Sequence, residues 1–181
     1  MLGMRWSPRR ALALLLLAAA THLLAVWALP RLIMARLAAG ATAAEKSGVY
    51  LPPMTDHQQR RIVMPSPDLL YATCAFDLRE RGLAIRADPR NAGHAGYWSI
   101  ALYATNSDNF DVNNDRQAGD APLHLMLRRD GDAAAPLPAG AKLVTSPSSR
   151  GLLLMRVLVA DYAREAAVVE AARRTLRCEP L

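Results

Sequence analysis

A run of nineteen residues without a formal charge, ALALLLLAAATHLLAVWAL from Ala11 to Leu29, dominates the N-terminal part of the chain. As a helix that rises about 1.5 Å per residue, this run is roughly 28 Å long, close to the ~30 Å hydrocarbon thickness of a bilayer. Only Thr21 and His22 within it are polar, and a helix satisfies its own backbone groups. We therefore predict a transmembrane helix over residues 11–30.

A cleaved signal peptide and a buried core helix fit this run less well. A signal peptide finds small residues for a cleavage site in ARLAAGATAA, residues 35–44, but the apolar run exceeds the usual ~7–15 residues of such a peptide. A buried core helix would need a uniformly apolar surface inside a small protein. Trp6 and Trp27 lie near the two ends of the run, where indole rings favour the membrane interface. An uncleaved anchor therefore fits the run best.

The formal net charge of +6 is concentrated in the same segment. Five basic residues and no acidic residue precede residue 38, which leaves 17 basic against 16 acidic residues in the remainder. A nucleic-acid partner is therefore not supported. Three of these arginines precede the apolar run and two follow it, so the positive-inside rule favours residues 1–10 in the cytoplasm. We then expect the rest of the chain in the periplasm of a bacterium, anchored in the inner membrane.

The chain after the anchor divides into a connector and one domain. Residues 31–60 are expected to continue the anchor helix and then become irregular, with Pro52 and Pro53 near the end. Residues 61–181 contain short β-type segments separated by turn-forming residues, followed by a stretch with helical period over residues 161–176 that starts at the N-cap residue Asp161. The predicted strands are 69–78, 83–87, 97–105, 123–130, 142–147 and 151–159.

These segments predict a mainly β fold with one C-terminal α-helix. Too few helices lie between the strands for a parallel sheet, so an antiparallel sandwich or a partly open barrel is expected. In the strand 97–105, Trp98, Ile100 and Leu102 share the more apolar face. The nearly continuous apolar run 151–159 is typical of a central strand that is covered on both faces.

The two cysteines, Cys74 and Cys178, leave two alternatives open. In an oxidising compartment they form one disulfide that closes a loop of about a hundred residues, worth ~4 kcal/mol in the chain-entropy model. Otherwise they are independent thiols, one buried in a strand and one near a frayed terminus, and the sequence slightly favours this alternative. Because the chain has neither a CxxC motif nor a Cys/His pair, we predict no zinc site and no cofactor.

Several segments together resemble a known bacterial family, the "domain of unknown function 1254". The similarity covers roughly residues 61 to 181 and does not include the anchor. The ordered segments are SPDLLY (66–71) leading into AFDL (75–78), YWSIALYATNSDNF (97–110), MRVLV (155–159) and EPL (179–181).

This resemblance implies an immunoglobulin-like β-sandwich and no established activity. Longer relatives in the family add a second β domain, the "domain of unknown function 1214", so the resemblance implies that a separate envelope protein carrying that domain is the partner. The family usually has the motif asparagine–proline–aspartate–threonine, and in this chain Leu69 stands in the position of the threonine. A pocket shaped by that motif would be altered here.

The acidic stretch TNSDNFDVNND, residues 105–115, superficially resembles a calcium loop. Asp111, Asn113 and Asp115 fit the first three ligands of an EF-hand, but Arg116 stands at the glycine position and Pro122 at the position of the bidentate glutamate. An irregular calcium site from Asp108, Asp111 and Asp115 is a second alternative. We favour a solvated connection between strands, in which Asn and Asp side chains cap turns. Asn106 and Asp108 either shape only this turn or also face a shared pocket.

Arg156 interrupts the apolar strand 151–159. A buried arginine is rare unless it is paired, so we expect an internal ion pair with Asp68 or Asp77, or an edge position. The functional alternative is an anion-binding residue in a pocket with Tyr71 and Tyr97.

Catalysis has little support in the sequence, and no catalytic residue is predicted. The chain has no HExxH motif and no GxSxG motif, and its four histidines are dispersed. We therefore predict a membrane-anchored periplasmic β-sandwich that acts as a binding module in the cell envelope. The alternative is a periplasmic hydrolase or small-ligand enzyme that uses Asp68, Tyr71, Tyr97 and Arg156 around one pocket.

Overall fold

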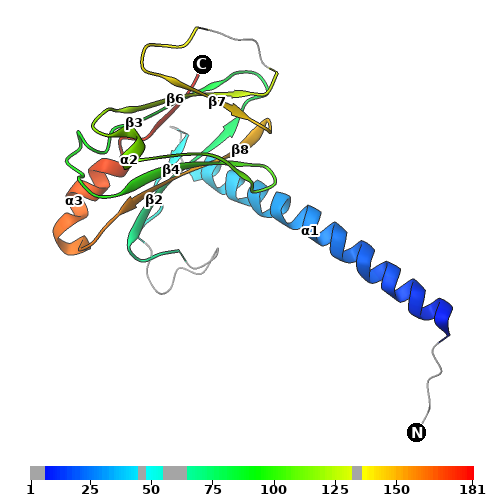
Figure 1. The fold of residues 1–181 in the computed structure, drawn as a ribbon. Coiled ribbons are helices and arrows are strands. Elements are labelled where there is room, and N and C mark those ends of the chain that lie inside the picture. The colour runs from blue at the N-terminus through cyan, green and yellow to red at the C-terminus, as the bar shows by residue number, and fades with distance from the viewer. Residues whose placement is uncertain (1–6, 45–47, 55–64, 132–135) are drawn as a thin grey trace.

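The protein consists of a long N-terminal helix and a two-sheet β domain (Figure 1). The computed structural model describes residues 7–44, 48–54, 65–131 and 136–181. The elements are α1 (Pro8–Ala44), β1 (Val49–Tyr50), β2 (Leu69–Asp77), β3 (Leu83–Ala87), β4 (Trp98–Ala104), β5 (Asn109–Asn114), α2 (Asp115–Ala118), β6 (Leu123–Arg129), β7 (Lys142–Ser146), β8 (Arg150–Leu158), α3 (Tyr162–Arg173) and β9 (Arg177–Pro180).

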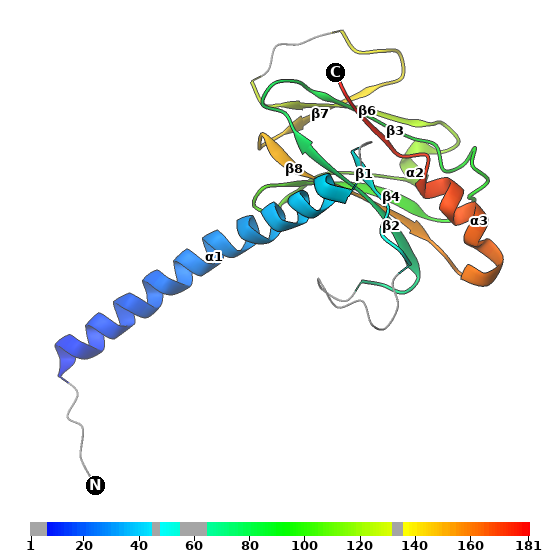
Figure 2. The ribbon, with the colours of Figure 1, turned by 180° about the vertical axis from the view of Figure 1, so that it is seen from behind.

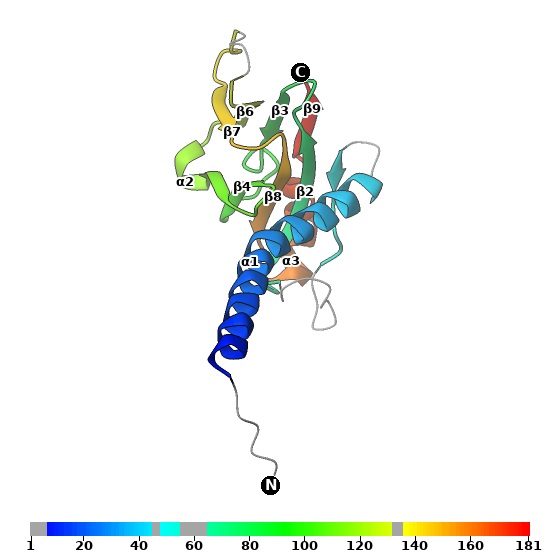
Figure 3. The same cartoon turned by 90° about the vertical axis from the view of Figure 1, so that its right-hand side faces the viewer.

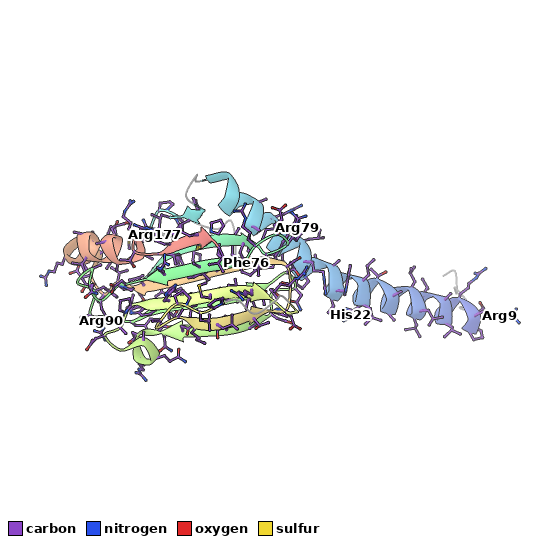
Figure 4. The ribbon with its side chains drawn as sticks, turned by 90° about the horizontal axis from the view of Figure 1, so that it is seen from above. Arg9, His22, Phe76, Arg79, Arg90 and Arg177 are labelled. Atoms are coloured by element: carbon purple, nitrogen blue, oxygen red, sulfur yellow. A yellow bond between two sulfur atoms is a disulfide. The ribbon has the colours of Figure 1, made fainter. Side chains whose placement is uncertain are left out.

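Helix α1 begins where Ser7 precedes Pro8. The Ser7 backbone oxygen accepts from the N–H groups of Arg10 and Ala11 at 3.0 and 3.1 Å, and proline at the first helical position loses no hydrogen bond. The helix then runs for 37 residues and projects away from the domain, with His22 far from the sheets (Figure 4). Its segment Pro8–Gly40 is long and apolar enough to cross a membrane.

The strands of the described chain form two sheets that pack face to face (Figure 1). Sheet A has the order β1-β2-β8-β4-β5 and is antiparallel throughout. Sheet B has the order β7-β6-β3-β9, and its pair β6–β7 is parallel. The expectation of a purely antiparallel sandwich is therefore wrong for this pair. The connection over residues 130–141 has about the dozen residues that a parallel crossover needs.

The core lies between the sheets and follows the alternation of the strands. The predicted apolar face of β4 is confirmed, because Trp98, Ile100 and Leu102 are at most 1% exposed. Strand β8 is the central strand of sheet A, as its composition predicted. Gly151 of β8 pairs with Phe76, and a Cβ there would meet the Phe76 ring at 2.3 Å. Glycine is therefore required where this ring crosses the neighbouring strand.

The outer face of sheet A, which points away from sheet B, is only partly covered by the described segments. The C-terminal part of α1 crosses it, and Met34 is buried against Leu152 of β8 (Figure 3). Leu37, Tyr50, Ala75 and Tyr103 pack around this contact. Leu158, at the other end of β8, is exposed. Within the described part of the chain, the expectation that β8 is covered on both faces thus holds for the half of the strand that α1 crosses.

Two different links close the two sides of the sandwich. On one side Cys74 of β2 and Cys178 of β9 form a disulfide between the sheets, so the cysteines are not separate thiols. On the other side the Lys142 ammonium on β7 donates to Asp111 Oδ1 on β5 at 2.8 Å and to Asn113 Oδ1 at 3.2 Å. The Asn113 amide in turn donates to Asp111 Oδ2 at 2.6 Å.

The stretch TNSDNFDVNND is more regular than the expected solvated connection. Its second half is strand β5, and Asn114 then caps α2 by accepting from the Gln117 N–H at 3.0 Å. The prediction failed because Asn and Asp disfavour strands. Here the side chains of Asp111 and Asn113 face Lys142, which satisfies their polar groups at the edge of the sandwich.

The C-terminal helix is shorter than the predicted 161–176. Asp161 is its N-cap and accepts from the Ala163 N–H at 3.1 Å. The helix ends at Arg173, and Leu176 is buried in the turn that leads into β9. The helical spacing of Leu176 was misleading, because the chain must turn there for Cys178 to pair with Ile85 of β3. Strand β9 was not predicted.

Replacing Cys74 and Cys178 with serine is expected to lower the free energy of unfolding of the full chain. The cysteines are 104 residues apart, and a loop of that length corresponds to about 4 kcal/mol in the chain-entropy model. Urea denaturation of the detergent-solubilised protein measures this change. A reductant should destabilise the wild type by a similar amount and leave the double variant unchanged. Equal stability of the wild type with and without reductant would contradict a structural disulfide.

Candidate functional site

The half of the outer face of sheet A that no described segment covers carries a row of polar side chains. Arg156 of β8 pairs with Tyr71 of β2 on one side and with Ser99 of β4 on the other. Ser99 pairs in turn with Asn114 of β5. Directly paired residues of antiparallel strands point to the same face with neighbouring side chains. Tyr71, Arg156, Ser99 and Asn114 therefore lie side by side across four strands, and we call them the outer row.

The polar atoms of the outer row are poorly satisfied within the described part of the chain. The Nε of Arg156 and the Oγ of Ser99 are buried and have no hydrogen-bond partner there. The hydroxyl oxygen of Tyr71 accepts from the Ser66 N–H at 3.1 Å, which leaves its proton available as a donor. Leaving a buried polar group unpaired costs about 1–3 kcal/mol. The stability of the fold therefore does not explain why these polar side chains lie together.

Apolar side chains surround the outer row and remain exposed to solvent. Leu158, Val112 and Tyr97 are 37%, 39% and 41% exposed. Val112 pairs with Ala101 on the same face, and the Leu158 N–H donates to the Tyr97 carbonyl at 2.9 Å. An arginine within an exposed apolar surface that includes tyrosines has the composition of a protein-binding surface.

The structure brings together four of the six predicted site residues. Tyr71 and Arg156 are neighbours in the outer row, and Tyr97 lies at the adjoining end of β4. Asp68 directly precedes β2, and its carbonyl accepts from the Val159 N–H at 2.9 Å. These residues lie on or beside the half of the outer face of sheet A that no described segment covers, near the end of the domain that carries α3 (Figure 1).

Asn106 and Asp108 lie at the opposite end of sheet A, in the turn between β4 and β5. The Asn106 amide donates to the Asp108 carboxylate at 2.5 Å, and the Asp108 N–H donates to Asn106 Oδ1 at 3.3 Å. Ser107 between them has a φ of 72°, the left-handed backbone that such a turn requires. Both side chains therefore shape the turn and do not face the outer row.

The expected ion pair of Arg156 with Asp68 or Asp77 does not form among the described residues. Asp77 instead accepts from Arg79 at 2.7 Å and from Arg150 at 2.9 Å. Hydrogen bonding from Arg79 holds the pKa of the Asp77 carboxyl well below its usual range, even though burial opposes this shift. The cluster lies at the end where α1 leaves the domain, as the position of Arg79 shows (Figure 4). An edge position for Arg156 is also wrong, because β8 is the central strand.

Arg173 is a buried arginine with a full set of partners, and sequence reasoning did not identify its role. It is 4% exposed, and it donates to both carboxylate oxygens of Glu170 at 2.6 and 2.7 Å. Its Nη1 also donates to the carbonyls of Pro52 at 2.5 Å and Tyr71 at 3.1 Å. Arg173 thus joins α3 to β2 and to the segment that follows β1. Its place in the last turn of α3 also suits the helix dipole.

The described residues contain no group of three metal-ligating side chains. Of the carboxylates proposed for calcium, Asp111 binds the Lys142 ammonium, and Asp108 binds Asn106. A groove of about 480 Å³ does exist, next to the disulfide and between β2, the β2–β3 turn and β9. Its polar lining includes the paired Asp77 and Arg79, whose charges already neutralise one another.

Comparison with known families gives one decisive match. The family model described as "Protein of unknown function (DUF1254)" matches residues 49–180, which is most of the chain and all of the β domain. The chain belongs to the DUF1254 family. The resemblance seen in the sequence is thereby confirmed, whereas α1 lies outside the matched residues.

A solved structure shows the same fold within a longer protein. The crystal structure of the VPA0106 protein from Vibrio parahaemolyticus matches this DUF1254 domain with a TM-score of 0.56 at 14% identity, over 64% of this chain and 28% of that one. A putative uncharacterized protein from Burkholderia cenocepacia matches with a TM-score of 0.47 at 19% identity, over 81% of this chain and 39% of that one. The match thus spans less than half the length of either protein. No curated protein matches this chain.

Two arginines of the DUF1254 domain, Arg173 and Arg156, should respond differently to substitution. Arg173→Met removes the partner of Glu170 and two carbonyl contacts, so it should destabilise the protein by about 3–5 kcal/mol. Arg156→Met keeps an apolar stem and removes an unsatisfied group, so stability should change by less than about 1 kcal/mol or increase. Urea denaturation of both variants gives the comparison. Strong destabilisation by Arg156→Met would show that Arg156 has a structural partner.

Proposed function

We propose that this chain is a single-pass protein of the bacterial inner membrane whose β domain lies in the periplasm and binds another envelope protein. The observation that carries the proposal is the half of the outer face of sheet A that no described segment covers, where the buried Nε of Arg156 lacks a described partner and apolar side chains are exposed. The same domain is fastened to a helix that is long enough to cross a membrane.

The disulfide and the charge distribution support the periplasmic location. Disulfides form and persist in oxidising compartments, and the Cys74–Cys178 bond links the two sheets of this domain. Three arginines precede the apolar run of α1 and two follow it. The positive-inside rule therefore favours a cytoplasmic N-terminus, which is consistent with a disulfide on the oxidising side.

The arrangement of the site supports binding more than hydrolysis. A hydrolase would need its nucleophile and base around a cavity that excludes water. Tyr71, Tyr97 and Arg156 instead lie on a sheet face that no described segment covers. His94, the histidine nearest to Tyr97 in sequence, is buried with its Nε2 3.3 Å from the Tyr97 carbonyl, as expected for a structural histidine.

The partner that we propose is a protein carrying the companion "domain of unknown function 1214". The VPA0106 protein supports this partner indirectly, because the matched part is only 28% of its chain. In that protein a domain with this fold therefore accompanies a larger part of the same polypeptide.

The orientation is tested by thiol labelling of the full chain in intact spheroplasts. After reduction with a membrane-impermeant phosphine, an impermeant maleimide should label Cys74 and Cys178 without lysis. Replacing Arg5, Arg9 and Arg10 with glutamate weakens the positive-inside signal, so this variant should place part of the population in the opposite orientation. Labelling that requires lysis of the spheroplasts in the wild type would contradict a periplasmic domain.

The binding function is tested by chemical cross-linking of the full chain in membranes of the source bacterium. We expect one envelope protein to be recovered with it in stoichiometric yield, and the reciprocal purification to recover this chain. The double cysteine-to-serine variant, whose domain is destabilised, is the control for dependence on a folded surface. Recovery of the folded protein alone, in both detergent extracts and cross-linked membranes, would contradict the interaction module.

A further inference from the structure

We propose that Arg156 of the outer row binds a carboxylate, and that an Asp or Glu side chain of the partner protein pairs with it beside Tyr71. This inference rests on the proposed binding function and specifies the chemistry of the contact. The charge of the site, the shape of its surroundings and its place relative to the membrane each support it.

The charge of Arg156 is not compensated within the described part of the chain. Asp68 does not pair with Arg156 among the described residues, Glu170 binds Arg173, and Asp161 caps the first turn of α3. Asp115, which follows Asn114, has a buried Oδ1 that also lacks a described partner. Glu165 accepts from the Ala160 N–H at 3.0 Å. A guanidinium whose buried Nε is unsatisfied favours an incoming anion, because the anion removes the cost of the uncompensated charge.

The neighbours of Arg156 in the outer row are neutral hydrogen-bonding groups. Tyr71 pairs directly with Arg156 and has a phenol proton to donate, whereas Ser99 is 0% exposed and is not accessible to a partner. Asn114, two strands from Arg156, uses its Oδ1 for the cap of α2. One cation with a neighbouring neutral donor matches the single charge and two oxygens of a carboxylate. A phosphate group would require more positive charge than the row contains.

The surroundings of the outer row favour a protein over a small molecule. Small ligands bind in concave cavities that bury most of their surface, and the groove described above lies elsewhere, beside the disulfide. The outer row lies on a sheet face and is flanked by exposed Tyr97, Val112 and Leu158. Apolar residues around a central arginine exclude water when a partner packs on them, which strengthens the charged contact.

The position of the outer row keeps it accessible to another envelope protein. Helix α1 leaves the domain at the end marked by Arg79, whereas the outer row lies near α3 at the other end (Figures 1 and 4). Figure 2 shows from behind that α1 runs away from the α3 end of the domain. When α1 spans a bilayer, the lipid headgroups therefore lie nearest the Arg79 end, away from the end that carries α3.

The test uses site-specific photo-cross-linking of the full chain in native membranes. A photoreactive phenylalanine at Val112 probes the face of the outer row, and one at Leu143, which is 45% exposed on β7 of sheet B, is the matched control. We expect a protein adduct at Val112 but not at Leu143. In the Arg156→Glu background this adduct should weaken by roughly 30-fold or more, because truncating one member of a charged contact costs at least about 2 kcal/mol.

A charge exchange identifies the group that binds Arg156. Mass spectrometry locates the cross-linked segment of the partner, and its acidic residues are replaced one at a time with arginine. One of these substitutions should restore the adduct of Arg156→Glu, and Arg156→Lys should keep part of the wild-type yield. Because Arg156→Glu can impair folding, Arg156→Met is measured in parallel and should also lose the adduct while its melting temperature stays at the wild-type value.

Several outcomes would overturn the site. An Arg156→Glu adduct at the wild-type yield, a loss that no acidic-to-arginine exchange restores, or adducts with lipid or with a second copy of this chain alone would each exclude a partner carboxylate. A protein adduct at Leu143 without one at Val112 would retain the binding module and reject the outer row. The absence of any protein adduct at both positions would also remove the proposed function.

Discussion

The apolar side chains of helix α1 lie in two different environments. Most of α1 exposes leucines and alanines that suit a bilayer, and its C-terminal part buries Met34 against Leu152 of sheet A. Because Met34 follows Pro30 by only four residues, the β domain is held close to the end of the apolar run without a flexible spacer. The packing of this one helix therefore determines which half of the sheet α1 covers and which half it leaves open.

Arg173 and Arg156 differ in whether their guanidinium groups have hydrogen-bond partners in the domain. Arg173 has its guanidinium satisfied by Glu170 and by carbonyls from two further segments, so it connects parts of the fold. Arg156 extends from the central strand towards the part of the outer face that no described segment covers, and its buried Nε lacks a partner among the described residues. An unsatisfied buried polar group lowers the stability of the free protein, and stability alone would favour an apolar residue at the same position. The presence of Arg156 there therefore points to a function.

The sequence predicted those elements whose evidence is local. The strands near Leu69 and Trp98 and the N-cap at Asp161 were predicted correctly because alternation and capping act within a few residues. Strand β5, strand β9 and the parallel pair β6–β7 depend on partners far away in the chain, such as Lys142 for Asp111. The distance of Asn106 from the outer row follows from the register of sheet A, which no local pattern contains.

The disulfide also has a consequence for the order in which the protein is made. In the proposed topology Cys74 crosses the membrane 104 residues before Cys178, so it remains a single thiol during most of the export of the domain. These 181 residues contain two cysteines, so no incorrect pairing is available among them. Until Cys178 is exported, the Cys74 thiol can react with small thiols or with other chains. Cys178 lies on strand β9, so the same short segment forms the edge of sheet B and provides the cysteine that pairs with Cys74. The Cys74 thiol can no longer react with other thiols once this strand has been exported and the disulfide has formed.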